Sequence, residues 1–215
     1  MKVVLVCLVL ACLPLQGFSQ YKEMDWKERD TWMALDTIFS AIGVEKGDRV
    51  ADIGCHEGYL SVRLAKKIGK KGKVYAVDLR TDRLQTLKDI SKERKLDNIK
   101  TIVGDYDNPN LPKGRLDTVI IMDTYHEITD YMTVLGHVKS ALKPGGQIVI
   151  IEKLKSRIKG KSRDEQTDAH SLGPKYVEQE LRKAGFTIRY ENNDLGDWEN
   201  DPDKVIWMLI ATKAK

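Results

Sequence analysis

Short apolar segments alternate with segments of helical periodicity between residues 49 and 184, and this alternation constrains the fold more than any other feature. The clearest apolar segment is Val119-Ile120-Ile121, a continuous run typical of a strand buried on both faces of a parallel sheet. Strands are expected at 49–53, 73–77, 99–103, 116–122 and 147–152, and helices at 21–42, 59–68, 80–95, 129–142 and 175–184. The order of these elements predicts an α/β protein with a doubly wound sheet.

The C-terminal part departs from this alternation. Two further strands are expected at 187–190 and 205–212, separated by the polar segment 191–203 and by no helix. Strands joined without a crossover helix pair antiparallel, so the last strand is expected to run against the others. A chain of 215 residues with this pattern is expected to form a single domain.

The N-terminus has the pattern of an export signal. Met1-Lys2 is followed by the apolar run 3–15 and then by Gly17-Phe18-Ser19, which predicts a signal peptide at 1–19 and an exported protein, periplasmic or secreted. An alternative is a membrane-anchored lipoprotein lipidated at Cys12. The mature chain would carry no transmembrane span, because the apolar run is shorter than the roughly 20 residues that a helix needs.

Charge and cysteine usage exclude two further classes. The net charge is only +4 and both signs are interleaved, which argues against a nucleic-acid partner because such a protein needs a clustered basic face. The mature chain would keep one cysteine, Cys55, and one cysteine cannot form an internal disulfide.

Polar residues and glycines follow the ends of the predicted strands, where doubly wound sheets bind their ligands. Asp52-Ile53-Gly54 and Gly58 follow the first strand, and Asp78 ends the second, where a carboxylate can accept both hydroxyls of a ribose. Gly104-Asp105 follows the third strand, and 122–127 follows the fourth. Together these segments predict a nucleotide-type cofactor site.

From about Trp26 to its C-terminus the chain resembles the class I S-adenosylmethionine-dependent methyltransferases. Val-Ala-Asp-Ile-Gly at 50–54 is similar to the first motif of that family, Asp78 to its acidic second motif, and Gly104-Asp105 to its third. The segment 117–123 resembles the fourth motif, and Leu-Lys-Pro-Gly-Gly at 142–146 the turn before the fifth strand. The resemblance implies a seven-stranded Rossmann-like sheet, with a helical cap at 20–43 and the methyltransferase domain at 44–215.

The resemblance also implies roles for individual residues. Asp52 would lie near the amino group of the cofactor, Gly54 and Gly58 would let its methionine part pass the backbone, and Asp123 would lie by the methionine end or the sulfonium. Asp78 would hold the ribose. The adenine would lie against Leu79, Asp105 and Tyr106.

The resemblance extends to the methyl acceptor. Thr124-Tyr125-His126-Glu127 and His170 most resemble small-molecule methyltransferases, including those that modify quinones. A base is needed only if the acceptor must lose a proton, and His126 and Tyr125 are the candidate catalytic residues just past the fourth strand. A histidine that only forms a hydrogen bond at a helix start is the alternative for His126.

One position departs from the pattern of the family. The first loop usually reads Gly-x-Gly-x-Gly, whereas His56 occupies the middle glycine position here and Glu57 follows it. A side chain at this position either turns away from the ligand or takes part of its space. A second hypothesis is therefore a degenerate, non-catalytic binding module in the cell envelope.

No metal site is expected. His126-Glu127 begins like the helix of a zinc protease, but the second histidine of that motif is missing. The fifth strand ends in Glu152-Lys153-Leu154, whereas catechol-type methyltransferases bind their metal through an Asp-Asn pair at this point. The basic segment 153–173 is interpreted either as a solvated loop or as a lid over the strand ends.

Overall fold

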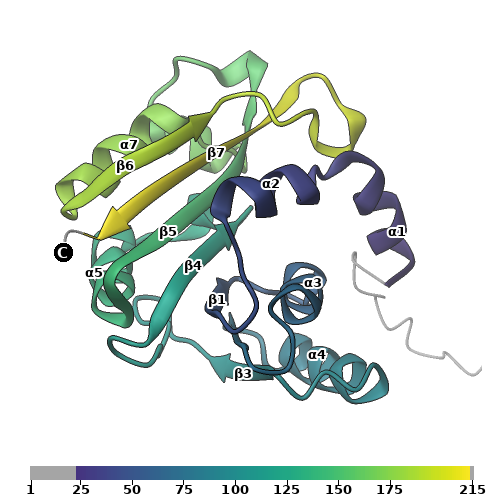
Figure 1. Ribbon diagram of the computed structural model, residues 1–215. Helices are drawn as coiled ribbons and strands as arrows, with labels where there is room; N and C mark the ends of the chain where they lie inside the picture. Colours follow the sequence, from purple (N-terminus) through teal and green to yellow (C-terminus); the bar gives the residue numbers. More distant parts are fainter. Residues whose placement is uncertain (1–22, 214–215) are drawn as a thin grey trace, which may run out of the picture.

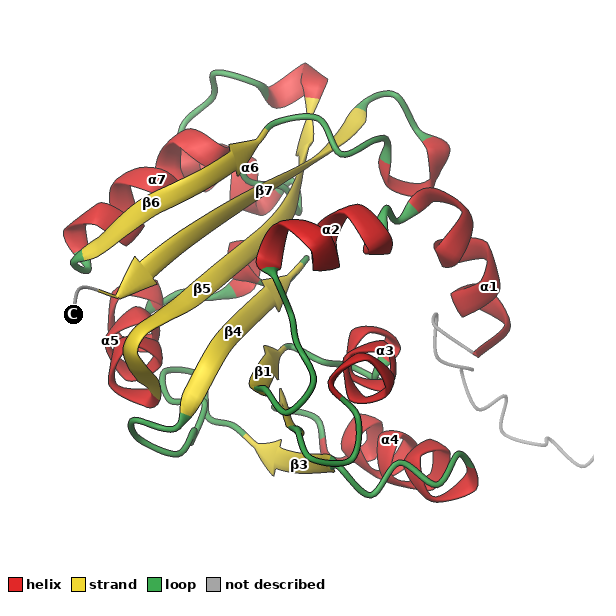
Figure 2. Cartoon of the chain, viewed as in Figure 1, coloured by secondary structure: helices red, strands yellow, loops and turns green. Residues whose placement is uncertain are grey.

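The computed structural model describes residues 23–213 and shows a seven-stranded sheet with helices on both faces (Figures 1 and 2). The predicted signal peptide at 1–19 and the candidate lipidation site at Cys12 lie outside the described residues. Within the described part of the chain, no helix is long and apolar enough to cross a membrane.

The sheet contains five parallel strands and two antiparallel pairings, in the order β3-β2-β1-β4-β5-β7-β6. The strands are β1 Arg49–Ile53, β2 Lys73–Asp78, β3 Ile99–Val103, β4 Leu116–Met122, β5 Leu142–Lys155, β6 Phe186–Asn192 and β7 Lys204–Lys213. β7 pairs antiparallel with both β5 and β6, which confirms the prediction for the last two strands. The predicted fold class is therefore confirmed.

Helices cover each face of the sheet and bury separate apolar clusters. They are α1 Glu23–Trp32, α2 Leu35–Ile42, α3 Tyr59–Ile68, α4 Thr81–Glu93, α5 Tyr131–Ala141, α6 Arg163–Asp168 and α7 Pro174–Lys183, with the short 3-10 turns η1 Tyr125–Glu127, η2 Ser156–Ile158 and η3 Trp198–Asn200. One cluster joins α2, α3 and α4 to the sheet, and the other joins α5 and α7 to its opposite face. Apolar alternate residues of the central strands supply both clusters, as expected for a parallel sheet covered on both faces.

One predicted helix differs from the observed structure. The single helix expected at 21–42 is divided into α1 and α2 by a break at Met33 and Ala34, where the amide of Leu35 donates a 2.6 Å hydrogen bond to the carbonyl of Met33. Met33 is buried at this break, so the turn packs an apolar side chain into the core. Gly43 caps the C-terminus of α2: its backbone is left-handed and its amide donates a hydrogen bond to the carbonyl of Phe39.

The winding of the sheet reverses between β1 and β4, which are neighbours although β2 and β3 lie between them in the sequence. Parallel strands end at one edge of the sheet, so the segments that follow β1, β2, β3 and β4 meet there. The fold thus brings together the sequence segments that were predicted to form the cofactor site.

Candidate functional site

A cavity of about 600 Å³ lies at the reversal point of the sheet. Its lining comes from the loops that follow β1, β2, β3 and β4, and from α1. A volume of this size falls within the range of small-molecule and cofactor sites. Of the eight residues predicted to bind the cofactor, Gly58 is absent from this lining. The other seven line the cavity: Asp52, Gly54, Asp78, Leu79, Asp105, Tyr106 and Asp123.

The Asp78 carboxylate is held rigidly at the end of β2. One carboxylate oxygen accepts a 2.8 Å hydrogen bond from the amide of His56, and the other accepts a 2.9 Å hydrogen bond from the amide of Arg80. Each oxygen can accept a further hydrogen bond, because a carboxylate has about four acceptor sites in all. Asp78 is therefore oriented by the backbone and retains capacity for two hydroxyl groups of a ligand.

Asp52 is the most deeply buried carboxylate of the cavity lining, at 2% exposure. The hydroxyl of Ser61, in α3, donates a 2.6 Å hydrogen bond to it. Burial raises the pKa of Asp52 to about 6, and the Ser61 hydrogen bond and the charge of Arg29 only partly oppose this effect. A buried carboxylate of this kind favours a cationic ligand group.

Two large apolar side chains at the rim of the cavity are exposed. Leu79 is 45% exposed and Tyr106 is 86% exposed. Asp105 lies beside them, where one of its carboxylate oxygens accepts a 3.1 Å hydrogen bond from the side-chain amide of Asn110. Exposed apolar surface next to a carboxylate suits a planar base that carries an amino group, as the resemblance implies for adenine.

The two glycines of the first loop are required by contacts within the protein. A Cβ atom at Gly54 would lie 2.3 Å from the hydroxyl oxygen of Thr124, and one at Gly58 would lie 2.2 Å from a methyl carbon of Leu87. Both glycines are also left-handed, with φ of 74° and 95°. Close packing of the loop against Thr124 and α4 is thus a direct reason for glycine at these positions, beside the predicted approach of a ligand.

His56 adopts a left-handed backbone conformation, which usually favours glycine. Its φ is 49°, and its side chain lines the cavity. Burial and the charge of Arg83 lower the pKa of His56. The next side chain, Glu57, is held by a buried ion pair with Arg83 of α4. The first loop therefore combines a histidine side chain with a backbone conformation that suits glycine.

The left-handed backbone at His56 predicts an order of stability between two variants. His56→Gly should be more stable than His56→Ala by about 1 kcal/mol, because a residue with a Cβ atom is strained in this conformation. Urea unfolding of the two variants measures the difference. Equal stabilities would contradict the left-handed assignment of residue 56.

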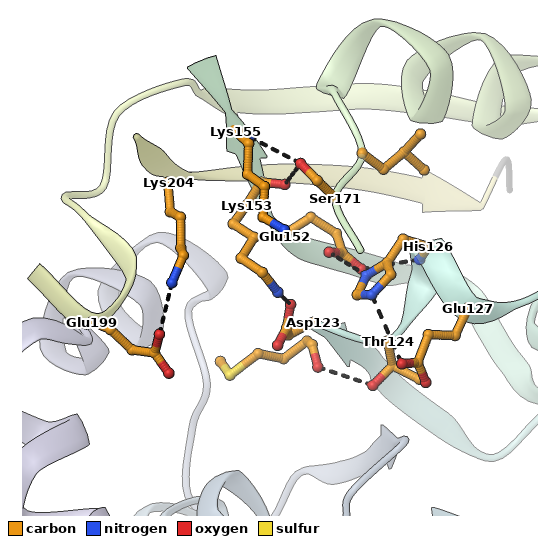
Figure 3. Close-up of polar contacts among 12 residues, drawn as sticks. Asp123, Thr124, His126, Glu127, Glu152, Lys153, Lys155, Ser171, Glu199 and Lys204 are labelled. Atoms are coloured by element: carbon orange, nitrogen blue, oxygen red, sulfur yellow. Dashed lines mark hydrogen bonds and ion pairs between the residues drawn. The ribbon is translucent and has the colours of Figure 1, made fainter. Parts of the chain in front are cut away.

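Asp123 follows β4 and is paired with Lys153 of β5. The Asp123 carboxylate accepts a hydrogen bond from the Lys153 ammonium (Figure 3). The Lys153 ammonium also lies over the Trp198 ring, 4.7 Å from its centre. Asp123 is left-handed, with a φ of 52°. It lines the cavity as predicted, but this ion pair offsets its negative charge.

The two candidate catalytic residues lie in η1, and neither is among the cavity-lining residues. The Tyr125 hydroxyl donates a 2.9 Å hydrogen bond to Glu180 of α7, and burial raises its pKa. A buried phenol engaged in this way is poorly suited to accept a proton. His126 is 6% exposed, and its Nδ1 lies 2.9 Å from a carboxylate oxygen of Glu152.

The environment of His126 favours its protonated form. Burial alone would lower the pKa of His126, but the hydrogen bond and the charge of Glu152, together with the charge of Asp123, raise it. The amide of His126 also donates to Glu152, at 3.2 Å. The catalytic role of His126 and Tyr125 stays a prediction. To act as a base, either side chain would first have to break its hydrogen bond to Glu152 or Glu180.

Sequence reasoning missed the contribution of α1 to the cavity. Trp26 and Arg29 of α1 line it. The Arg29 guanidinium lies 4.3 Å from the centre of the Tyr59 ring, and α1 is tied to α3 by hydrogen bonds from Tyr59 and Arg63 to Asp30. The sequence does carry a signal for this contribution, because the spacing of Trp26, Arg29 and Trp32 places them on one face of a helix.

The basic segment 153–173, interpreted as a solvated loop or a lid, is largely ordered into secondary structure. It contains the end of β5, η2 and α6, and α6 begins with a capping box between Ser162 and Glu165. Among the described residues that line the cavity, none comes from this segment. The capping box favours a helix at this point, although the many basic residues of the segment did not suggest one.

A family model described as "Methyltransferase domain" matches residues 44–201, which is most of the chain. The chain belongs to this methyltransferase family. The match and the described fold together identify a class I S-adenosylmethionine-dependent methyltransferase, which confirms the resemblance seen in the sequence motifs. S-adenosylmethionine is the cofactor of this class.

Curated relatives of this methyltransferase include a demethylmenaquinone methyltransferase of Geobacillus sp. (strain WCH70), 33% identical over 131 residues. The alignment covers 61% of this chain and 53% of the relative, so the chain spans about half the length of the curated relatives it matches. A relative with the same name from Staphylococcus aureus (strain JH9) is 28% identical over 136 residues, covering 63% of this chain and 52% of the relative.

Solved structures share the fold of this methyltransferase. A SAM-dependent methyltransferase from Aquifex aeolicus has a TM-score of 0.73 at 20% identity and covers 91% of this chain and 100% of that chain. Phosphoethanolamine N-methyltransferase 2 of Haemonchus contortus, in complex with S-adenosyl-L-methionine, has a TM-score of 0.71 at 18% identity. It covers 92% of this chain and 59% of that chain.

The residues of the cavity fit S-adenosylmethionine on three independent grounds. Asp78 presents two fixed oxygens to a ribose, Leu79 and Tyr106 offer exposed apolar surface to a base, and the buried Asp52 favours a cationic group. These features lie around one cavity at the ends of neighbouring strands. The donor set and the volume therefore match a nucleoside that carries an amino acid.

Proposed function

We propose that this chain transfers the methyl group of S-adenosylmethionine to a small aromatic acceptor of the reduced quinone type. The observation that carries the proposal is the extension of the cavity beyond the strand ends to α1, where Trp26 and Arg29 complete its wall. The names of the curated relatives, demethylmenaquinone methyltransferases, support the same acceptor class.

The chain would contribute position and electrostatics to this reaction. Asp78, Leu79, Asp105 and Tyr106 would hold the nucleoside part, and Asp52 the amino group. S-adenosylmethionine supplies, when bound, a methyl group activated by the sulfonium. The fixed carboxylates lower the entropy cost of bringing the two reactants together, which is one of the contributions that a protein makes to such a displacement.

The α1 wall is suited to a planar and electron-rich acceptor. Trp26 is buried against Tyr59, with ring centroids 6.0 Å apart in an edge-to-face arrangement. The Arg29 guanidinium lies among the rings of Tyr59, Trp198 and Trp32, at 4.3, 4.9 and 5.7 Å from their centres. An aromatic acceptor with a hydroxyl or phenolate would find both apolar surface and positive charge here.

A transfer assay tests the proposal. The purified chain is incubated with methyl-labelled S-adenosylmethionine and a reduced naphthoquinone that lacks the methyl group, with the oxidised quinone and a catechol as comparison acceptors. Label is expected in the reduced naphthoquinone only, and Asp78→Ala should lower kcat/KM by about 5- to 150-fold, the equivalent of about 1–3 kcal/mol. Asp82→Ala, which changes an exposed carboxylate outside the cavity lining, is the matched control and should retain activity.

Three outcomes would contradict the proposal in different ways. Transfer to catechol alone would replace the acceptor class. Cofactor binding without transfer to any acceptor would favour the non-catalytic binding module. Equal loss of activity in Asp78→Ala and Asp82→Ala would remove the assignment of Asp78 to the cofactor site.

A further inference from the structure

Two histidines and a glutamate from distant parts of the chain meet beside the cavity. His126 and Glu127 lie in η1, and His170 follows α6. The donor atoms of the three side chains all lie within 4.8 Å of one another. The Nε2 atom of His126 is 3.9 Å from a carboxylate oxygen of Glu127, and the rings of His126 and His170 meet edge to face with centroids 6.0 Å apart.

His126 is oriented as a metal-binding histidine is. Its Nδ1 is hydrogen-bonded to the fully buried Glu152, which also accepts a hydrogen bond from the His126 amide (Figure 3). A carboxylate bound to one ring nitrogen fixes the orientation of the ring, and the other nitrogen offers its lone pair to an ion once binding has displaced its proton. In His126 that other nitrogen is Nε2, which faces Glu127.

We propose that His126, Glu127 and His170 bind a divalent transition metal ion of the zinc type, with Glu152 as the positioning residue behind His126. Two imidazoles and a carboxylate form a ligand set that Zn²⁺ uses in sites with three protein ligands and an open position. Glu127 lines the cavity, so the proposed metal site adjoins the cavity in which the cofactor and acceptor of the proposed function bind.

The geometry needs only a small adjustment. Ligand atoms around a tetrahedral Zn²⁺ with bonds of about 2.0–2.1 Å lie about 3.4 Å apart. The His126 and Glu127 atoms are 3.9 Å apart and no pair is more than 4.8 Å apart, so metal binding needs each pair to close by about 1.4 Å at most. Glu127 and His170 are exposed and can make this movement, while the buried His126 stays fixed.

The charges around the three ligands also favour a cation. The carboxylates of Glu152 and Glu127 lie next to His126, and the ammonium of Lys153 is engaged by Asp123. A second set of donor atoms, Asp123, His126 and Glu152, also lies within 4.8 Å. It is a poorer site, because Lys153 already neutralises Asp123 and Glu152 already holds His126.

This ligand set is different from the one whose absence argued against a metal in the sequence. The expected pattern was an Asp-Asn pair after the fifth strand, or a second histidine four residues after His126. The fold supplies the second histidine from His170, 44 positions further along the chain than His126. No spacing rule connects two residues that only tertiary structure brings together.

Metal titrations test the site without relying on methyl transfer. The untagged chain is titrated with Zn²⁺ in competition with a chromophoric chelator, and Co²⁺ is used to record the visible absorption that reports ligand geometry. One ion per chain is expected to bind, with affinity lowered at least tenfold in His170→Ala and about 10- to 100-fold in Glu152→Gln. His137→Ala, a histidine in α5 away from the cluster, is the matched control and should bind as the wild type does.

The comparison between variants decides the proposal, because every other histidine and cysteine of the chain is present in each of them. His170 is exposed, so its replacement is expected to leave the fold intact even if Glu152→Gln does not. Wild-type affinity in His170→Ala, or an equal loss in His137→Ala, would show that the ion binds elsewhere and would overturn the proposal.

Discussion

Replacing Asp52 with asparagine is expected to change the pH dependence of stability by about 3 kcal/mol. The pKa of Asp52 is raised from 3.8 to about 6, mainly by burial, so the folded state binds a proton between pH 4 and pH 6 that the unfolded state releases. The contribution of Asp52 to stability is therefore fully present below pH 4 and is lost as the pH rises through 6. A shift of about two units corresponds to about 3 kcal/mol.

The variant lacks this titration, so its stability relative to the wild type should increase between pH 4.5 and pH 7.5. Asparagine can still accept the hydrogen bond from Ser61, which keeps the local contact in place. Urea unfolding across this pH range measures the effect. The change with pH is the readout, because it is independent of any constant difference between the two side chains.

Asp36→Asn is the matched control, since Asp36 is an exposed carboxylate at the start of α2. It should show the same pH profile as the wild type. If the stability of Asp52→Asn changed with pH in the same way as that of the wild type, the raised pKa of Asp52 would be contradicted.

Asp52→Asn is also expected to bind S-adenosylmethionine more weakly than the wild type above pH 6, where the wild type offers a charged carboxylate to the amino group of the cofactor.

Asp78→Ala is expected to weaken S-adenosylmethionine binding by about 1–3 kcal/mol, or about 5- to 150-fold in Kd. A hydrogen bond to a charged group has this value, and Asp78 holds two oxygens in place at the end of β2. The replacement also removes the acceptor for the amides of His56 and Arg80. A loss of affinity alone would therefore combine the ribose contact with a change in the loop.

A ligand that lacks both ribose hydroxyls separates these two effects. The wild type should bind an adenosine analogue with hydroxyls more tightly than its dideoxy counterpart, and Asp78→Ala should bind the two almost equally. Calorimetry of the four combinations measures the coupling. An undiminished preference for the hydroxylated analogue in Asp78→Ala would show that the ribose contact lies elsewhere.

The sequence was sufficient for the sheet because its buried strands are continuous apolar runs. Buried strands are predicted directly by two such runs, Val119-Ile120-Ile121 and the segment around Ile148 to Ile151. The polar connection at 191–203, which contains no helix, predicted the antiparallel pairing at the end of the sheet. The division between α1 and α2 was not predictable in this way. Neither glycine nor proline marks the break, which follows the packing of Met33.

In the candidate site, the sequence likewise predicted the residues that sheet topology places, but not the contacts that depend on packing. Asp52, Asp78 and Asp105 follow strands in one sheet, so topology alone places them at one edge. Lys153 belongs to the basic segment that the sequence suggests is a solvated loop or a lid. In the structure it lies in β5, and its side chain contacts Asp123 and Trp198. Tyr125 and Glu180 are 55 positions apart, and their hydrogen bond depends on how α7 packs on the sheet.

We expect the cavity at the reversal of the sheet to bind S-adenosylmethionine although His56 stands at a glycine position of the family pattern. The most direct test is a calorimetric titration of the purified wild-type chain with S-adenosylmethionine, followed by displacement with S-adenosylhomocysteine. We expect a single site of roughly micromolar Kd that both ligands share, in the range expected for a small ligand with several charged contacts. A folded chain that gives no binding heat with either ligand and shows no stabilisation by them would contradict this expectation, because His56 would then occupy the space of the cofactor.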